Sequence, residues 1–242
     1  MSIIRVPIPE WAFDTTLRIC IEREQNFRNQ FVTKKLRSLV SDNPILARNV
    51  EGVIGYIGDI CACVWLGMDP KEHLRQMLIS TDLLAHRDEY DVLYRGWRID
   101  VKTELVPDNA FQAVVSRSIM PEVRYGCRLI NGTQFRENSH SVDIYLFGLL
   151  DQWDPRSAKF WYPVGAIAHK EIVSLCPQPL DYVGPRCLHT PAHVIPTQYL
   201  RPPEDLLSIK ERSVGSMHKV EFSTLPEAVL HKYRQLCTKV GL

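Results

Sequence analysis

Residues 90–104, with the sequence YDVLYRGWRIDVKTE, constrain the fold of this chain more than any other stretch, because they follow the pattern of a β-hairpin. Residues 90–94 and 97–105 are rich in β-branched and aromatic side chains, which favour strands. Arg95 and Gly96 separate the two runs as a two-residue turn. The sequence therefore predicts two antiparallel strands joined by a tight turn.

Three charged side chains of this predicted hairpin are expected to converge on one point. Side chains alternate along a strand, so Asp100 and Lys102 project from the same face and Val101 from the other. Asp91 lies at the start of the first arm and is expected to pair across the hairpin near Asp100. Two carboxylates beside one ammonium are typical of a site for a divalent metal and a phosphate.

Length and composition place the chain among globular proteins. Its 242 residues suffice for a full core, and 45% hydrophobic and 24% charged residues are ordinary values. We expect a single domain over 1–242, with a core at about 50–175, an N-terminal helix at about 14–38 and a wrapping C-terminal tail at about 176–242. The formal net charge of +1 means that a polyanionic partner must be held by a local basic patch.

The cysteines and the hydropathy pattern indicate the cellular compartment. Seven cysteines, an odd number at irregular spacing, are typical of reduced intracellular thiols rather than of a disulfide framework. No run of 18 apolar residues occurs, and no long apolar stretch follows a basic segment at the N-terminus. We therefore expect a soluble cytoplasmic protein without a membrane partner, and the sequence leaves a homo-oligomer open.

The first part of the chain predicts helices, one of which carries an acid among apolar residues. Residues 14–38 are amphipathic, and residues 69–79 begin with the Asp-Pro pair of a helix N-terminus. Residues 50–67 have apolar side chains at core spacing, interrupted by Asp59. A carboxylate is costly to bury unless it is paired or binds a metal. Asp59 is therefore either a functional ligand or a residue at the water-facing edge of its helix.

Four arginines follow in residues 117–140, which are expected to form a loop after a short strand at 111–116. Arginines interleaved with aromatic side chains can contact a nucleic-acid backbone and stack on bases. Four arginines in such a segment are also common on an ordinary protein surface, so both interpretations stay open. The arginines are Arg117, Arg124, Arg128 and Arg136, and the aromatic residues are Tyr125 and Phe135.

The second part of the chain predicts the middle of a sheet. Residues 142–150 form the most apolar strand-like run and are expected to be central in the sheet. Residues 159–168 predict its hairpin partner, in which Pro163 indicates an edge or a bulge. A short helix is expected near 170, followed by extended chain in the proline-rich tail and a last amphipathic helix at 225–238.

The tail also contains ligand types that suit zinc, in the order Cys176, Cys187, His189 and His193. Structural zinc sites normally contain a tight pair of cysteines, which is missing there. The chain has no glycine-rich phosphate loop, no nucleophile elbow and no His-Glu-x-x-His motif. The hairpin is therefore the chemical signal that we follow.

The hairpin and the acidic helix before it resemble the PD-(D/E)XK nuclease superfamily, which has the restriction-endonuclease-like fold. The matching residues follow the family's order, with Gly58-Asp59 in a helix, Asp91 in one strand and Asp100-Val101-Lys102 in the next. Eight residues separate Asp91 from Asp100. The resemblance covers about residues 50–170 and implies an α/β domain with a mixed central sheet flanked by helices.

The resemblance implies a metal-dependent nuclease that hydrolyses phosphodiester bonds. Asp91, Asp100 and the carbonyl of Val101 would hold Mg²⁺ or Mn²⁺, both of which prefer oxygen ligands. Asp59 would complete the metal shell or bind a second ion. Lys102 would orient or help to deprotonate the attacking water and offset charge on the phosphorane-like transition state.

A nucleic acid is the partner that this function implies, with DNA expected over RNA from the family's substrates alone. Arg95 and Arg98, in and beside the turn, are expected to contact phosphates, as are Arg117, Arg124 and Arg128, and Thr103 would line the substrate groove. Two alternatives stay open, an inactive nucleic-acid-binding module of the same fold and a structural or assembly protein. In the plainest alternative, Asp100 and Lys102 form an exposed ion pair worth under about 1 kcal/mol.

Overall fold

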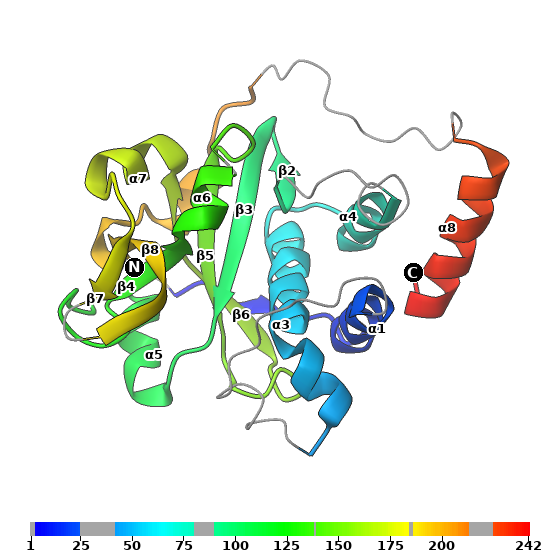
Figure 1. The fold of residues 1–242 in the computed structure, drawn as a ribbon, viewed down its shortest axis with the longest axis horizontal. Coiled ribbons are helices and arrows are strands. Elements are labelled where there is room, and N and C mark those ends of the chain that lie inside the picture. Colours follow the sequence, from blue (N-terminus) through cyan, green and yellow to red (C-terminus); the bar gives the residue numbers. More distant parts are fainter. Residues whose placement is uncertain (1–2, 25–41, 80–89, 138, 184–185, 213–224) are drawn as a thin grey trace. The chain divides into compact units, whose positions relative to one another are not determined.

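The structure is a computed structural model of the chain and describes residues 3–24, 42–79, 90–137, 139–183, 186–212 and 225–242 (Figure 1). The chain divides into two compact units. Unit 1 comprises Met1–Arg5, Glu89–Asp151 and Trp161–Ser213, and unit 2 comprises Val6–Asp88, Gln152–Phe160 and Val214–Leu242. Each unit is thus assembled from separate stretches, and the expectation of one domain over 1–242 stays a prediction.

The larger sheet of unit 1 contains the predicted hairpin. Its strands there follow the order β6-β5-β3-β2. The β3–β5 pair is parallel, whereas β2–β3 and β5–β6 are antiparallel. A mixed sheet accompanied by helices confirms the predicted α/β class. The strands are β2 (Val92–Tyr94), β3 (Trp97–Glu104), β5 (Ile144–Leu150) and β6 (Phe160–Ala168).

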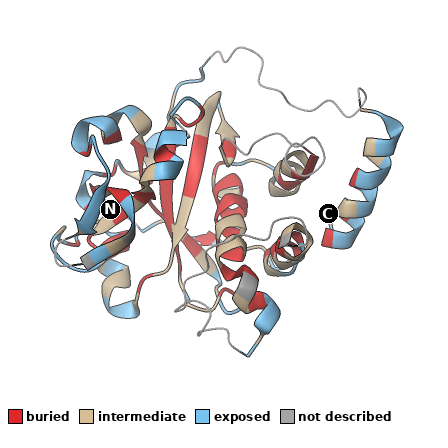
Figure 2. Ribbon diagram, viewed as in Figure 1, coloured by how far each residue is buried: buried red, intermediate tan, exposed pale blue. Residues whose placement is uncertain are grey.

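Strand β5 lies inside this sheet, and all seven of its residues are buried (Figure 2). Its side chains Tyr145, Phe147 and Leu149 belong to the main core cluster of unit 1. The prediction of a central strand at 142–150 with an antiparallel partner is therefore confirmed. The register between β5 and β6 shifts after Phe147, so that Gly148 faces Pro163, as the proline predicted.

A second sheet in unit 1 was not expected. Strands β4 (Cys127–Asn131), β8 (Arg186–Pro196) and β7 (Leu180–Val183) pair in that order and are antiparallel. The predictions of a loop over 117–140 and of a merely extended tail are wrong for these residues. Strands that pair over more than fifty residues of sequence leave no local signal.

The predicted strand at 111–116 is also wrong, because these residues belong to helix α5 (Asp108–Val115). Pro107 is the N-cap and Asp108 lies in the first turn, where a carboxylate favours a helix N-terminus. The remaining helical segments of unit 1 are α6 (Gly132–Glu137), α7 (His169–Leu175), η2 (Thr197–Tyr199) and η3 (Pro203–Leu206).

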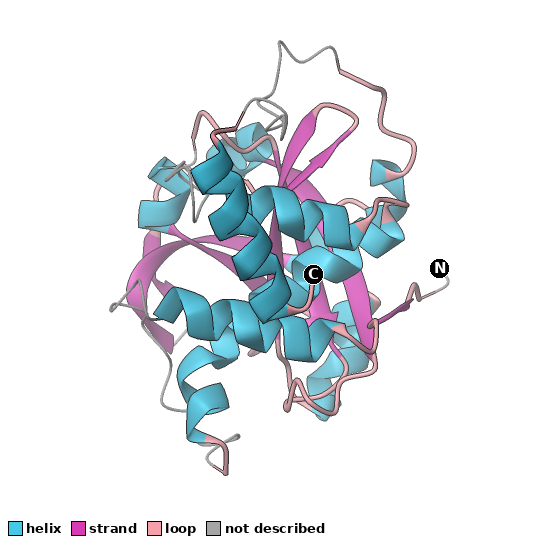
Figure 3. Ribbon diagram, turned by 90° about the vertical axis from the view of Figure 1, so that its right-hand side faces the viewer, coloured by secondary structure: helices cyan, strands magenta, loops and turns pink. Residues whose placement is uncertain are grey.

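Helices make up most of the regular structure of unit 2 (Figure 3). One core cluster takes a buried residue from each helix, namely Ile19, Ile60, Leu74 and Val240, and a second cluster includes Tyr233 and Cys237 of α8. Asp69 caps α4 through the backbone N–H groups of Lys71 and Glu72, as predicted. The elements are β1 (Val6–Pro7), α1 (Ala12–Glu24), α3 (Pro44–Trp65), α4 (Pro70–Met77) and α8 (Glu227–Val240).

The structure tests two further expectations about unit 2 and the membrane. The predicted helix at 14–38 begins at Ala12, and its part from residue 25 onward lies outside the described residues. In the part of the chain that the structure describes, no helix is both long and apolar enough to cross a bilayer.

Candidate active site

The hairpin brings Asp91 beside the part of β3 that contains Asp100. Arg95 and Gly96 both have positive φ angles, 49° and 78°, which is typical of a type I′ hairpin turn. The paired register ends with Val92 opposite Ile99, and Asp91 is the residue before β2. The backbone N–H of Asp91 donates to the carbonyl of Ile99 at 3.0 Å, which is one residue out of that register. The predicted hairpin is therefore confirmed, and Asp91 lies beside the neighbours of Asp100 in β3.

Asp91 is held in place through its side chain as well. Its Oδ2 accepts a hydrogen bond from the backbone N–H of Val101 at 2.6 Å. This bond directs the carboxylate of Asp91 at the middle of β3, beside the residue that carries the second acid. A carboxylate that accepts one such bond keeps acceptor capacity on its other oxygen.

Asp100 and Lys102 lie on one face of β3 and form an ion pair between Oδ1 and Nζ. Asp100 is only 2% exposed, whereas the side chain of Lys102 is 21% exposed. The prediction that the two residues share a face is confirmed. The alternative of an exposed pair does not describe this geometry, since the carboxylate is buried and water screens it little.

Tyr145 of β5 gives independent evidence that both carboxylates point to the same region. In the parallel register Tyr145 lies beside Asp100, and it is fully buried. Burial raises the pKa of the Tyr145 phenol, and the negative charges of Asp100 and Asp91 raise that pKa further. Both carboxylates are thus close enough to act on one hydroxyl group.

The carbonyl of Val101 points to the same side of β3 as Asp91. Backbone groups alternate along a strand, and the Ile99 carbonyl, two residues before, accepts the hydrogen bond from Asp91. Asp91, Asp100 and this carbonyl therefore supply oxygen ligands only, which fits Mg²⁺ or Mn²⁺. Among the described residues, no group of three or more His, Cys, Asp or Glu side chains is arranged to hold a metal ion. The hypothesis of a metal site on the hairpin thus depends on two carboxylates and a carbonyl.

Asp59 lies in α3 and belongs to unit 2. It is 7% exposed, so the alternative of a water-facing residue at the edge of its helix is wrong. Burial raises the pKa of the neighbouring Cys61 thiol, and the charge of Asp59 raises it further. Its role as a further metal ligand stays a prediction.

Thr103 does not share the face of Asp100 and Lys102. Its Oγ1 accepts a hydrogen bond from Trp161 Nε1 at 3.2 Å, across Gly148 of β5. Neighbouring side chains of a strand point to opposite faces, and the expectation that Thr103 lines a substrate groove stays a prediction. The indole lies so close that a Cβ on Gly148 would stand 2.2 Å from Trp161 Cε2.

The predicted phosphate-binding arginines occupy different environments. Arg128 is fully buried, and its guanidinium donates to Glu104 Oε2 at 2.8 Å and to the Tyr125 carbonyl, so the structure does not present it at a surface. Arg117 donates to the Leu200 carbonyl at 2.7 Å. Arg124 is exposed and lies over the ring of Tyr125. Arg124 can therefore still contact a phosphate at the surface, whereas the buried Arg128 cannot.

The sequence did not single out Tyr145 or His169, which the fold brings to the acidic face. Tyr145 Oη lies 3.5 Å from His169 Nδ1, and the ring of His169 stacks on Phe135 with centroids 4.1 Å apart. Burial lowers the pKa of His169, and the charge of His193 lowers it further. The only sequence signal for Tyr145 is one hydroxyl group within an apolar strand.

The cysteine and histidine residues of the tail do not form a zinc site in the part of the chain that the structure describes. His193 is buried and its Nδ1 lies 2.7 Å from the carbonyl oxygen of Cys176. Cys187 is exposed.

Comparisons with protein-family models, with curated proteins and with solved structures return no match to this chain. The class that the fold defines is a mixed α/β protein with a charged hairpin strand beside an apolar central strand.

Proposed function

We propose that this chain is a metal-dependent nuclease of the PD-(D/E)XK kind, with the restriction-endonuclease-like fold, and that it hydrolyses phosphodiester bonds in nucleic acid. One observation carries the proposal. Asp91 is hydrogen-bonded to the backbone of Ile99 and of Val101, the two neighbours of Asp100, while Lys102 pairs with Asp100 from the same face. Two carboxylates, a carbonyl and an ammonium therefore meet on one hairpin.

Asp91, Asp100 and the Val101 carbonyl would hold the divalent ion. When bound, such an ion polarises a phosphoryl oxygen and lowers the pKa of a water molecule. The protein contributes preorganisation, because the hydrogen bond from the Val101 N–H fixes the carboxylate of Asp91 before any ligand arrives. Asp59 is proposed as a further metal ligand only because its place in the sequence follows the order of the family's motif.

Lys102 would act on the attacking water and on the developing charge. Its Nζ already lies against Asp100, and its partial exposure lets it approach a phosphate at the mouth of the site. An ammonium beside two carboxylates can orient a water through its N–H donors and offset negative charge on the phosphorane-like transition state. DNA is proposed as the substrate over RNA.

A cleavage assay with plasmid DNA, single-stranded DNA and RNA in Mg²⁺, Mn²⁺ or EDTA tests the proposal. Asp100→Asn and Lys102→Ala should each lower the cleavage rate by about 100-fold or more, while the matched variants Asp108→Asn and Lys170→Ala on exposed helix positions should cleave like the parent. Calorimetry should show Mn²⁺ binding that Asp91→Asn weakens.

Three outcomes would overturn the proposal or replace it. Absence of cleavage on all substrates, or equal rates for the parent and the Asp100 variant, contradicts the nuclease. Nucleic-acid binding without cleavage would instead support an inactive module of the same fold. Neither binding nor cleavage would favour a structural or assembly protein.

A further inference from the structure

Asp143, the residue before β5, holds two arginines that come from distant parts of the chain. Its Oδ2 accepts from the backbone N–H of Arg98 at 3.1 Å and from Arg98 Nε at 3.0 Å. Its Oδ1 accepts from Arg98 Nη2 and from Arg212 Nη1, both at 3.0 Å. One carboxylate therefore joins two guanidinium groups, which leaves a net positive charge on the cluster.

Residues 209–212, here called the strap, are bound to the turn of the hairpin and place Arg212 there. Arg95 Nη1 donates to the Ile209 carbonyl at 3.0 Å, and Trp97 Nε1 donates to the Lys210 carbonyl at 2.9 Å. The backbone N–H of Arg212 donates to the Arg95 carbonyl at 2.9 Å, and its guanidinium lies over the Trp97 ring at 5.3 Å. The position of Arg212 is thus set by the backbone and by an aromatic ring before any ligand binds.

The charges around the strap are mostly positive. The hairpin turn, the strap and Asp143 together contain four cations and two acids, a formal charge of +2 against the +1 of the whole chain; the cations are Arg95, Arg98, Lys210 and Arg212, and the acids are Asp143 and Glu211. Burial alone would raise the pKa of Asp143, but the hydrogen bonds from Arg98 and Arg212 lower it, so the carboxylate stays ionised at neutral pH. The surface is the kind of local basic patch that a nearly neutral chain needs to hold a polyanion.

The patch lies next to the proposed catalytic residues within unit 1. Arg98 and Asp100 are two residues apart on the same face of β3, which corresponds to about 7 Å along a strand. Arg212 is 49% exposed and uses one of its five N–H donors on Asp143 among the described residues. A guanidinium with donors to spare can bind phosphate oxygens in a bidentate way.

We propose that Arg98 and Arg212, joined on Asp143, form a phosphate-binding subsite beside Asp100 for the backbone of a nucleic acid, with Lys210 and the ring of Trp97 at its rim. The polymer class rests on the proposed function. The geometry supports a polymer over a single phosphate, because the cations extend from Arg98 along the strap to the turn.

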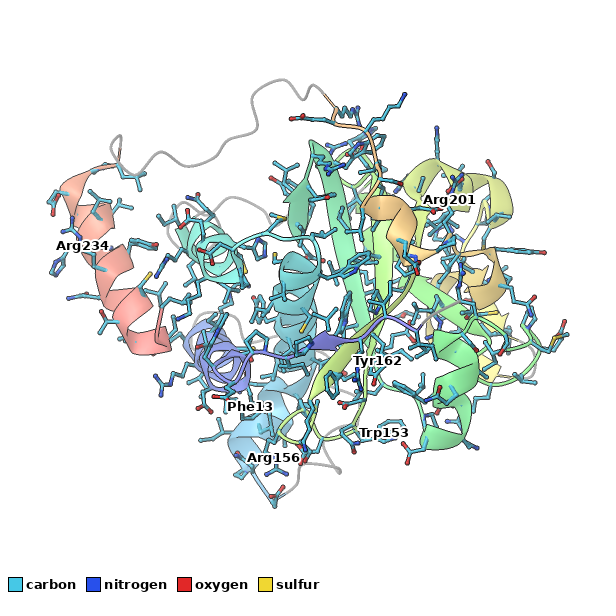
Figure 4. The ribbon with its side chains drawn as sticks, turned by 180° about the vertical axis from the view of Figure 1, so that it is seen from behind. Phe13, Trp153, Arg156, Tyr162, Arg201 and Arg234 are labelled. Carbon is cyan, nitrogen blue, oxygen red and sulfur yellow. The ribbon has the colours of Figure 1, made fainter. Side chains whose placement is uncertain are left out.

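Fluorescence anisotropy of a labelled DNA oligonucleotide in EDTA, at several salt concentrations, tests this subsite without cleavage. Arg212→Ala should weaken binding several-fold and reduce the salt slope by roughly 0.7 to 1, the change that one lost phosphate contact produces. Arg234→Ala is the matched control, because Arg234 lies exposed on α8 of unit 2 (Figure 4). It should bind as the parent does.

A second variant guards against a purely structural effect. Lys210→Ala removes an exposed side chain and keeps the carbonyl to which Trp97 donates, so it should fold normally and still weaken binding. Equal affinity and equal salt slope for the parent, Arg212→Ala and Lys210→Ala would overturn the subsite. Displacement of the DNA by inorganic phosphate at an equal concentration of phosphate groups would also overturn it, in favour of a small-anion site.

The two proposals can fail separately. Cleavage that needs Asp100, with DNA binding that does not depend on Arg212, would leave the nuclease and remove the subsite. DNA binding that depends on Arg212, without cleavage, would leave the subsite and remove the nuclease.

Discussion

Strands β3 and β5 run side by side in one sheet and carry opposite kinds of side chain. On the face that they share, β5 presents Tyr145, Phe147 and Leu149 to the core, while β3 sets a charged residue beside each of them. The apolar side chains of β5 shield the neighbouring charged side chains of β3 from water, which strengthens the electrostatic interactions of β3. Changes in both strands should therefore affect stability, with the larger effect in the close-packed strand β5. The charged residues are Asp100, Lys102 and Glu104.

The largest effect is expected from the one residue of β5 that lacks a side chain. Gly148→Ala would place a Cβ 2.2 Å from the Trp161 ring, which is anchored to Thr103 by its indole N–H. Because the clash involves a rigid buried ring, the free energy of unfolding should fall by more than about 4 kcal/mol. Chemical denaturation followed by circular dichroism measures it.

Two further variants separate this clash from a general effect of glycine replacement. Trp161→Phe in the Gly148→Ala background should restore part of the stability, because the smaller ring leaves room. Gly55→Ala in α3, where nothing lies within 4 Å of the new Cβ, should be neutral or stabilise by up to about 1 kcal/mol. Equal stability of Gly148→Ala and the parent would contradict the close packing of β5.

A smaller effect is expected on β3. Lys102→Met leaves the buried carboxylate of Asp100 without its ammonium and should lower the free energy of unfolding by about 3 kcal/mol. Combining it with Asp100→Asn removes the buried charge, so the double variant should regain parental stability or exceed it by about 1 kcal/mol. If the double variant is less stable than Lys102→Met, the ion pair between Asp100 and Lys102 stabilises the fold. The expectation that this buried pair lowers stability would then be wrong.

The hairpin was predictable because its determinants are local. Turn residues and alternating side chains fix the register of β2 on β3 within a few residues of sequence. The same alternation places Thr103 on the opposite face from Lys102, a consequence that the sequence already contained. The apolar run at 142–150 also predicted its own burial, because only an interior strand suits seven consecutive buried residues.

The parts of the fold and of the candidate site that the sequence did not predict depend on pairings between distant segments. The parallel register that places Tyr145 beside Asp100 joins residues 45 positions apart, and no local pattern encodes it. Arg128 was expected at a surface because arginines usually are, whereas β4 turns its side chain inward onto Glu104. The Arg98–Asp143–Arg212 cluster likewise depends on three segments that only the fold brings together.

The smallest expected effect concerns a titratable group that borders β5. His169 lies 3.5 Å from Tyr145 Oη and is surrounded by the charged or titratable groups His193, Asp143 and His140. Burial first, and then the charge of His193, lower the pKa of His169. As the pH falls through about 6.5, His169 therefore takes up a proton in the unfolded chain before it does so in the folded protein. The neutral His169 side chain thus contributes to stability above that pH, and the contribution is lost as the pH falls.

Thermal unfolding at pH 7 and pH 5 measures this contribution. The fall in Tm between the two values should be smaller for His169→Gln than for the parent, because glutamine cannot take up the proton in either state. His231→Gln, at an exposed position of α8, should show the parent's pH dependence. An identical fall in Tm for His169→Gln and the parent would mean that protonation of His169 does not affect the stability of the protein. The comparison between β5 and β3 would then involve charged groups on β3 alone.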